Sequence, residues 1–282
     1  MKIEVAKSAG FCIGVKKALE IAKNSAKSNQ QIYMLGDIVH NEEVIKDMQK
    51  IGIKKINRLA SGKNKTILIR AHGAPKSIHK SAKKYGYKII DATCPMVKEI
   101  HKIAQNQEKK GYTIIVIGDK NHDEVKGIVG QLNKQAIVIS PNLPIKSKQF
   151  KNIDKAAIVT QSTQNIEKVK KIVDKINKYI PDLKFINTIC GPTQQKQNEI
   201  KNIAKNNEIV LIIGSKMSAN TKRLYQISKN INFRTYWIEN KNNIQLSWLE
   251  GINSVGIAAG ASTPENIINS TVEKIKKISK AN

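Results

Sequence analysis

Aromatic residues and arginine are scarce in this 282-residue sequence, although its formal net charge is +27. Aromatic residues make up 5% of the chain, and only four of the 49 lysines and arginines are arginine: Arg58, Arg70, Arg223 and Arg234. Nucleic-acid-binding surfaces favour arginine forks and stacking aromatic rings. A basic nucleic-acid-binding protein is therefore a less favoured alternative, and we expect no nucleic-acid partner. Most lysines are interpreted as solvated helix faces, whose positive field attracts anionic substrates and acidic proteins.

Long apolar runs and the common nucleotide-binding motifs are also missing. No stretch approaches the roughly 18 unbroken apolar residues of a membrane span, and the start MKIEVAKSAG lacks the apolar core of a signal peptide. We therefore expect a cytoplasmic protein with no membrane partner. Neither a GxGxxG dinucleotide motif nor a GxxxxGK[ST] phosphate loop occurs.

Cysteine is rare as well, but the three cysteines occupy the same place in a repeated pattern. An apolar run precedes each cysteine, a glycine follows it after 24 residues, and a polar residue follows it after 28. The cysteines are Cys12, Cys94 and Cys190, the glycines are Gly36, Gly118 and Gly214, and the polar residues are His40, His122 and Ser218. This spacing indicates three copies of one unit, with thiolates that meet at one central point.

The apolar runs predict strands that alternate with helices, which is typical of an α/β protein with mostly parallel sheets. Strands are predicted near 2–7, 31–36, 52–56, 66–71, 87–91, 113–117, 135–140, 156–160, 184–188, 208–213, 234–238 and 254–259, and helices of the first unit near 13–28, 41–50 and 75–84. We expect three pseudo-threefold-related α/β domains, at 1–86, 87–182 and 183–282. In parallel sheets, ligands bind at the carboxyl ends of the strands.

The repeated cysteines favour a metal or cluster site. A lone cysteine is usually a small buried hydrophobic residue, but three in one structural position are harder to explain by packing. Their number is odd and no CxxC pair is present, so disulfides are not expected. Three thiolates suit zinc or an iron–sulfur cluster. A cubic four-iron cluster normally takes four cysteines, so three leave one iron open. A zinc-dependent enzyme acting on a phosphorylated substrate is the alternative.

Polar residues gather at the predicted strand ends, mostly just before helices, where backbone N–H groups and the helix dipole favour phosphate. They are His40, His72, His122, Ser162, Thr163, Ser218, Asn220 and Ser262. Histidine, serine and asparagine without clustered acids predict a phosphate or diphosphate site. The hydroxyl and amide side chains are also compatible with ordinary helix N-caps. His79 and His101 lie inside predicted helices and are interpreted as surface or packing residues.

One carboxyl group stands out in the segment GDKNHDEVKG. Glu124 follows His122 by two residues, as Glu42 follows His40 in the first unit. A carboxylic acid in a partly closed cavity can have its pKa raised into the working range and so deliver a proton. The alternative role is that of an acid in the first turn of a helix, favoured by the dipole. Asp123 is expected to point elsewhere.

Nine short motifs follow one another along almost the whole chain: AGFCIGV, VHN, AHG, DATCP, HDEVKG, TQST, TICGPTQQKQ, GSKMSAN and AGASTP. Together they resemble the 4-hydroxy-3-methylbut-2-enyl diphosphate reductase family, which ends the methylerythritol phosphate route to isoprenoids. The resemblance implies a trefoil of three α/β domains around one [4Fe-4S] cluster held by Cys12, Cys94 and Cys190. It also implies a reductive dehydroxylation that yields isopentenyl and dimethylallyl diphosphates, with ferredoxin or flavodoxin as the acidic electron donor.

Site roles follow from the same resemblance. The open iron would bind the hydroxyl oxygen of the substrate, and Glu124 would donate the proton, linked to Ser162 where the family commonly has threonine. The diphosphate would be held by His40, His72, Ser218, Asn220 and Ser262, with His122 in the same polar network. Ala219 departs from the family, in which a serine often stands beside the diphosphate, so a side-chain hydrogen bond is lost there.

Overall fold

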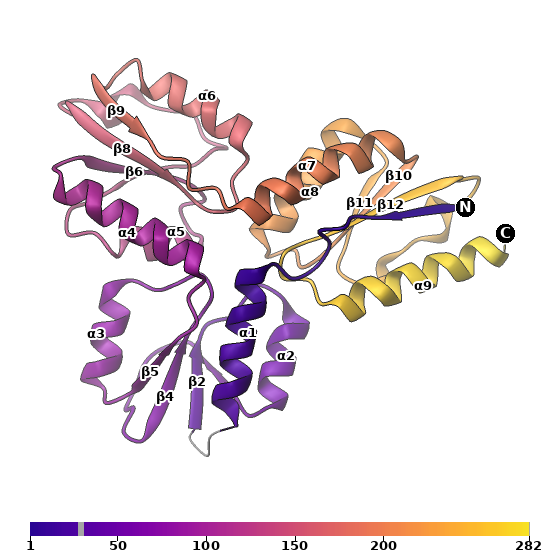
Figure 1. Ribbon diagram of the computed structural model, residues 1–282, viewed down its shortest axis with the longest axis horizontal. Coiled ribbons are helices and arrows are strands. Elements are labelled where there is room, and N and C mark those ends of the chain that lie inside the picture. The colour runs from indigo at the N-terminus through magenta and orange to yellow at the C-terminus, as the bar shows by residue number, and fades with distance from the viewer. Residues whose placement is uncertain (28–30, 282) are drawn as a thin grey trace. The chain divides into compact units, whose positions relative to one another are not determined.

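A computed structural model describes residues 1–27 and 31–281 (Figure 1). The chain divides into two compact units. Unit 1 comprises Met1–Lys16, Val39–Asp47 and Gly191–Asn282. Unit 2 comprises Lys17–Ile38 and Met48–Cys190. Each unit is therefore assembled from segments that are far apart in the sequence.

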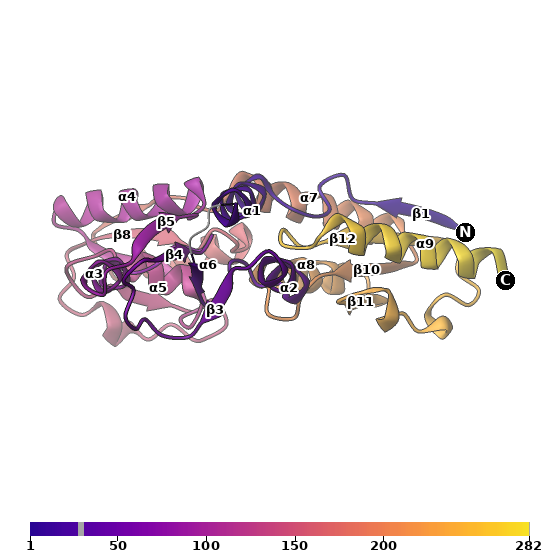
Figure 2. The ribbon, with the colours of Figure 1, turned by 90° about the horizontal axis from the view of Figure 1, so that it is seen from below.

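Three four-stranded sheets, all parallel, form the framework of the described residues. The sheet of unit 1 has the order β1 (Lys2–Val5), β12 (Ser254–Ala259), β10 (Ile209–Ile213) and β11 (Thr235–Ile238), an order visible in Figure 2. Unit 2 contains two sheets. One has the order β3 (Lys54–Ile56), β2 (Gln31–Leu35), β4 (Lys65–Ile69) and β5 (Lys88–Asp91). The other has the order β7 (Ile137–Ile139), β6 (Thr113–Ile117), β8 (Lys155–Thr160) and β9 (Asp182–Phe185).

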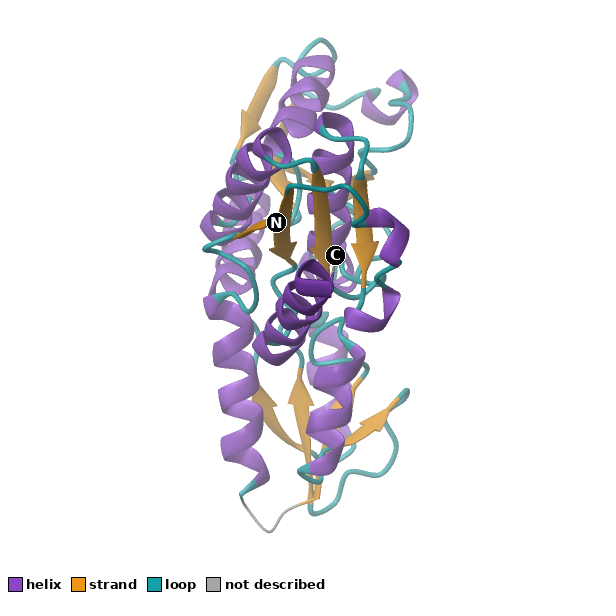
Figure 3. Cartoon of the chain, turned by 90° about the vertical axis from the view of Figure 1, so that its right-hand side faces the viewer, coloured by secondary structure: helices purple, strands orange, loops and turns teal. Residues whose placement is uncertain are grey.

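Helices alternate with these strands along the described chain (Figure 3). They are α1 (Ile13–Ala26), α2 (Glu42–Lys50), α3 (Lys76–Lys84), α4 (Pro95–Lys109), α5 (Asp123–Val129), α6 (Ile166–Ile176), α7 (Gly191–Asn206), α8 (Ala219–Ile231) and α9 (Glu265–Ala281). The predicted α/β class with parallel sheets is confirmed, and each predicted strand forms within three residues of its expected bounds. The helix predicted for 13–28 ends at Ala26, and residue 28 lies outside the described residues.

The strands do not follow the predicted domain boundaries. The strand before each cysteine pairs with the sheet of the preceding repeat: β5 joins β4, β9 joins β8, and β1 joins β12 at the other end of the chain. The strand that opens each predicted domain (1–86, 87–182 and 183–282) therefore belongs to the sheet of the preceding repeat, and for the first domain this is the sheet of the last repeat. For β5 and β9 the reason is that a strand following a crossover helix usually returns beside the strand that precedes the helix. β1 takes the equivalent position beside β12, although no crossover helix links these two strands.

The central strands are buried on both faces, which explains why they are continuous apolar runs rather than alternating ones. In unit 1, Ile209, Leu211 and Ile213 of β10 pack in the core that includes residues of α9, whereas Val210 and Ile212 pack with residues of α7 and α8. In unit 2, β6 lies in the same way between α6 on one face and α4 with α5 on the other. Burying each such side chain contributes about 1.5–3 kcal/mol. In the part of the chain that the structure describes, no helix combines the length and apolar character needed to cross a membrane.

The three repeated glycines occupy equivalent positions just beyond a strand. Each backbone N–H donates to the last residue of an edge strand, at 3.0 Å for Gly36 with Ile56 and Gly118 with Ile139 and at 2.9 Å for Gly214 with Ile238. A methyl group at any of them would lie within 2.8 Å of a neighbouring side chain: Arg70 for Gly36, Val125 for Gly118 and Thr221 for Gly214. Close approach therefore requires glycine at 118 and 214, whereas at Gly36 the neighbouring atom is the flexible end of Arg70 and the φ of +74° favours glycine.

We predict that Gly118→Ala lowers the free energy of unfolding by about 1–3 kcal/mol, the range for overpacking a tight site. The added methyl group would lie 2.7 Å from Val125 Cγ2 and 2.9 Å from Gln161 Cβ, so both residues must move. Gly191→Ala is the control, because nothing lies within 4 Å of its added methyl group. Urea unfolding followed by circular dichroism measures both, and a Gly118→Ala midpoint equal to wild type would contradict the argument.

Candidate functional site

The three cysteines are held by the same backbone hydrogen bond. Each cysteine N–H donates to the carbonyl of the second residue after a central strand: Cys12 to Ala261 at 3.2 Å, Cys94 to Ala71 at 3.0 Å and Cys190 to Ser162 at 3.0 Å. In each case the strand before the cysteine pairs with that central strand. The sequence repeat is therefore also a repeat of local backbone structure.

Each cysteine directly precedes a helix, namely α1, α4 and α7 for Cys12, Cys94 and Cys190. All three are partly exposed thiols rather than disulfides. The N-terminal end of a helix carries partial positive charge, which favours a negatively charged atom such as a thiolate. The three positions thus share an environment that suits binding of a positively charged metal centre through sulfur.

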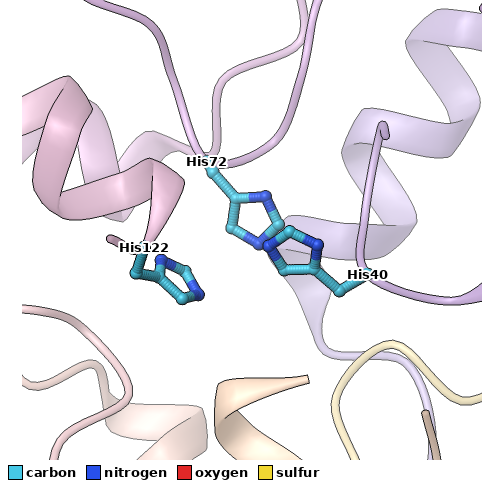
Figure 4. A group of neighbouring side chains, drawn as sticks. All are labelled: His40, His72 and His122. Carbon is cyan, nitrogen blue, oxygen red and sulfur yellow. The ribbon is translucent and has the colours of Figure 1, made fainter. Parts of the chain in front are cut away.

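His72 and His122 of unit 2 face each other at two strand ends (Figure 4). Their ring centroids are 5.3 Å apart and the ring planes are nearly perpendicular, at 89°. His122 is the N-cap of α5, and its Nδ1 accepts the backbone N–H of Glu124 at 3.1 Å. The neutral His122 ring therefore carries its hydrogen on Nε2.

Glu124 is buried, with 1% of its surface exposed. Its carboxylate accepts the backbone N–H of Ser162 at 2.6 Å and the Ser162 hydroxyl at 2.9 Å. Burial raises the pKa of Glu124 to about 7, although both hydrogen bonds from Ser162 act in the opposite direction. The carboxyl group is therefore poised to exchange a proton near neutral pH.

In unit 1, polar side chains lie at the starts of α8 and α9. Ser218 is the N-cap of α8 and accepts the backbone N–H of Thr221 at 3.3 Å. Asn220 is 4% exposed, and neither its amide nitrogen nor its amide oxygen has a hydrogen-bond partner among the described residues. Ser262 donates its hydroxyl to the carbonyl of His40 at 3.3 Å. A buried amide without partners costs about 1–3 kcal/mol, so Asn220 has unused capacity for a polar ligand.

Ala219 offers a ligand no polar side-chain atom, whereas Thr163 offers the hydrogen of its hydroxyl group. Ala219 is the first residue of α8, is mostly buried, and has no polar side-chain atom. The Thr163 hydroxyl accepts a hydrogen bond from Gln161 Nε2 at 3.0 Å, so its own hydrogen is free to point elsewhere. Gln161 Oε1 in turn accepts the Asp119 backbone N–H at 2.9 Å. Sequence reasoning assigned no role to Gln161, although it lies in the TQST motif.

Two residues next to the candidate site have structural roles. Asp123 forms an ion pair with Arg70, at 2.5 Å between Oδ2 and Nη1. His101 lies in α4 and is buried, and burial lowers its pKa to about 4, so the ring is neutral. The interpretation of His101 as a packing residue is thus confirmed. Its Cε1 would lie 2.9 Å from a methyl group at Gly73, which has φ +76°, so the turn after His72 requires glycine.

Residues 3–276 match the protein family described as LytB protein. The chain belongs to the LytB family. The 4-hydroxy-3-methylbut-2-enyl diphosphate reductase of Aquifex aeolicus is 39% identical to this LytB chain, and the alignment covers 98% of the chain and 96% of that protein. The reductase of the same name from Clostridioides difficile is 37% identical, with coverage of 99% and 100%.

Solved structures agree with this membership. A structure of (E)-4-hydroxy-3-methyl-but-2-enyl diphosphate reductase is 37% identical, with a TM-score of 0.73 and coverage of 98% of this LytB chain and 100% of that chain. The E-1-hydroxy-2-methyl-but-2-enyl-4-diphosphate reductase from Plasmodium falciparum is 29% identical, with a TM-score of 0.87 and coverage of 96% and 87%. Both likenesses extend over nearly the whole chain.

We predict that Glu124→Gln stabilises the protein more at pH 8 than at pH 5. Because the pKa of Glu124 is raised in the folded state, its carboxyl group stabilises the fold fully below about pH 4.5, and this contribution is lost as the pH rises through about 7. The glutamine side chain is neutral throughout, can accept the Ser162 N–H and can donate to the Ser162 hydroxyl. The difference between the two pH values is expected to reach up to about 3 kcal/mol.

Urea unfolding of the metal-free protein at both pH values measures this difference. Glu99→Gln, an exposed carboxyl group on α4 of the same unit, is the matched control and should show no such dependence. If Glu124→Gln changed the free energy of unfolding by the same amount at pH 5 and pH 8, burial would not raise the pKa of Glu124 into this range, and the prediction would be wrong.

Proposed function

We propose that this LytB chain is an iron–sulfur reductase that converts 4-hydroxy-3-methylbut-2-enyl diphosphate into isopentenyl and dimethylallyl diphosphates by reductive dehydroxylation. The observation that carries the proposal is the recurrence of one cysteine, held by the same backbone hydrogen bond, beside each of three parallel sheets. Near-full-length similarity to proteins named as reductases of this substrate supports it.

The cysteines have the chemistry that an iron–sulfur cluster requires. Three partly exposed cysteines at helix N-termini offer soft sulfur ligands, which suit iron–sulfur clusters. We propose that Cys12, Cys94 and Cys190 hold one [4Fe-4S] cluster. When bound, the cluster supplies the electrons for cleavage of the allylic carbon–oxygen bond.

The diphosphate is proposed to bind through polar side chains at helix starts. Asn220 provides the strongest support, because its buried amide has no partner among the described residues, and diphosphate oxygens would satisfy its N–H groups. The other proposed substrate-binding residues are His40, His72, His122, Ser162, Thr163, Ser218 and Ser262. At position 219 only the backbone N–H is available, since alanine replaces the serine often found in the family. Binding the diphosphate away from the reacting carbon contributes proximity.

Glu124 is proposed as the proton donor to the departing hydroxide. With a pKa of about 7, its carboxyl group is partly protonated at neutral pH, which matches the requirement for a general acid. Ser162 holds both carboxylate oxygens and so fixes the direction in which the proton is offered.

The electron donor is proposed to be an acidic protein such as ferredoxin or flavodoxin. The net charge of +27 favours encounter with an acidic partner at low salt. The absence of a dinucleotide motif from the sequence agrees with electrons that come from a protein.

We predict that the protein prepared without air is brown and contains about four iron and four sulfide ions per chain. Cys12→Ser, Cys94→Ser and Cys190→Ser should each lose most of the cluster and most of the reductase activity, because each removes one of the three thiolates. Iron and sulfide analysis with a visible spectrum measures this. A colourless protein with tightly bound zinc and no sulfide would show that the proposal is wrong, and full activity in one variant would remove that cysteine from the site.

We predict that turnover falls as pH rises through about 7, because Glu124 must be protonated to donate a proton. Glu124→Gln should lower turnover by roughly a hundredfold or more while substrate still perturbs the visible spectrum. Ser162→Ala should move the fall in turnover to higher pH, because the lost hydroxyl hydrogen bond normally lowers the pKa of Glu124.

Ser162→Thr is the matched control for this pH dependence, because it keeps the hydroxyl group. Its pH profile should follow that of the wild type. Near-normal turnover in Glu124→Gln would reduce Glu124 to a carboxylate at a helix start, and loss of substrate binding would make it a positioning residue.

A further inference from the structure

His72 and His122 follow strands of different sheets in unit 2, so strand pairing does not fix the distance between them. His72 lies beyond β4, whose sheet also contains β2, β3 and β5, whereas His122 lies beyond β6 of the other sheet. The two rings nevertheless pack edge to face, with centroids 5.3 Å apart (Figure 4). Contacts outside the strand pairing must therefore set this distance.

An ion pair joins the two segments that carry these histidines. Arg70 directly follows β4 and stands two residues before His72. Asp123 is the first residue of α5 and directly follows His122. Arg70 Nη1 donates to Asp123 Oδ2 at 2.5 Å, and each side chain is only 20% exposed. Charged atoms at this distance and largely removed from water attract each other more strongly than an exposed pair does.

The backbone around Arg70 defines the position of its side chain. The Gly73 N–H donates to the Arg70 carbonyl at 3.0 Å, which closes the turn that contains His72. Arg70 Nη1 also lies 2.8 Å from the position that a β-carbon would take at Gly36. The guanidinium group therefore lies against the main chain at Gly36 and contacts Asp123 through the same nitrogen atom.

Hydrogen bonds hold the other end of α5 against the segment that follows the His72 turn. The Lys76 N–H donates to the carbonyl of Gly130, the C-cap of α5, at 3.0 Å. Gln131 Nε2 donates to the Ala74 carbonyl at 2.8 Å. A helix of 7 residues is about 10 Å long, so these bonds act about 10 Å from the start of α5. The ion pair acts at that start, beside the N-cap His122.

We infer that Arg70 and Asp123 are positioning residues, and that their ion pair sets the spacing of the two histidine rings. The spacing is a property of unit 2 alone, whereas its consequence for the substrate rests on the proposed function, in which both histidines bind the diphosphate. A displaced ring binds the diphosphate less well in the ground state and in the transition state alike, which raises KM rather than lowering kcat. Glu124 keeps its own hydrogen bonds to Ser162, so proton delivery should be little affected.

Four variants and one control separate the ion pair from general stability. Arg70→Gln and Asp123→Asn each remove one charge and keep a polar side chain, the double variant removes both charges, and Arg70→Lys keeps the positive charge. Lys55→Gln is the matched control, because Lys55 forms an ion pair of the same length, 2.5 Å, with Asp37 in the same unit. That pair joins β3 to the residue two positions beyond β2 and so lies within one sheet.

The first readout is the steady-state kinetics of the anaerobic, cluster-containing protein with 4-hydroxy-3-methylbut-2-enyl diphosphate and reduced methyl viologen. Arg70→Gln and Asp123→Asn should each raise KM by roughly threefold or more, and the double variant should add nothing further, because one interaction is lost in all three. Arg70→Lys should lie closer to the wild type than Arg70→Gln, and Lys55→Gln should match the wild type. Additive effects of the two single substitutions, or a lower kcat with an unchanged KM, would overturn the inference.

Crystal structures of the same full-length proteins give a second readout, which does not depend on turnover. The centroids of the two histidine rings should move apart by roughly 1 Å in Arg70→Gln and Asp123→Asn, a displacement large enough to weaken binding. The separation should stay at the wild-type value in Lys55→Gln. An unchanged separation in both uncharged variants would overturn the inference. If the wild type does not convert the substrate, the proposed function fails, and the ring separation still decides the role of the ion pair.

Discussion

The hydrogen bond from each cysteine N–H to the carbonyl two residues beyond a central strand is the constraint on which the candidate site depends. Parallel pairing fixes the register of two neighbouring strands, so the residues just beyond their carboxyl ends are brought together without help from side chains. Ala261, Ala71 and Ser162 receive these bonds. The backbone positions of the cysteines therefore follow from strand pairing in the three sheets.

Buried polar and ionisable groups accompany this framework. Glu124 is a buried carboxyl group with a raised pKa, Asn220 is a buried amide without described partners, and Lys196 is a buried ammonium group that donates to the backbone carbonyls of Gly10 and Ala259. Each costs folding free energy that an apolar residue would not cost. Proteins retain such groups where binding or proton transfer uses them. All three residues lie in motifs that resemble the reductase family. Stability alone therefore does not explain why these polar groups are buried.

Local patterns in the sequence predicted the strands, because a strand buried on both faces is a continuous apolar run whatever its partners are. The same patterns could not predict which sheet a strand joins. β1 pairs with β12 across almost the whole chain, and nothing in KIEV specifies that partner. The contacts of Gln161 and Lys196 could not be predicted for a related reason. Both lie in motifs that sequence analysis singled out, but their partners, Asp119 for Gln161 and Gly10 for Lys196, are distant in sequence and reveal themselves only through the fold.

At the residue that accepts the cysteine N–H, the second repeat has a side-chain hydroxyl group, that of Ser162. The equivalent residues Ala71 and Ala261 accept the same backbone bond from a cysteine but carry no side-chain donor. Ser162 accepts the Cys190 N–H with its carbonyl and holds the Glu124 carboxylate with its N–H and hydroxyl, so one residue connects a thiol to a titratable acid. Glu42, the counterpart of Glu124 in the first repeat, is exposed, whereas Glu124 is buried. A local backbone structure that occurs in three repeats thus holds a buried acid in the second, which agrees with the proposal that the repeats share metal binding while Glu124 alone delivers the proton.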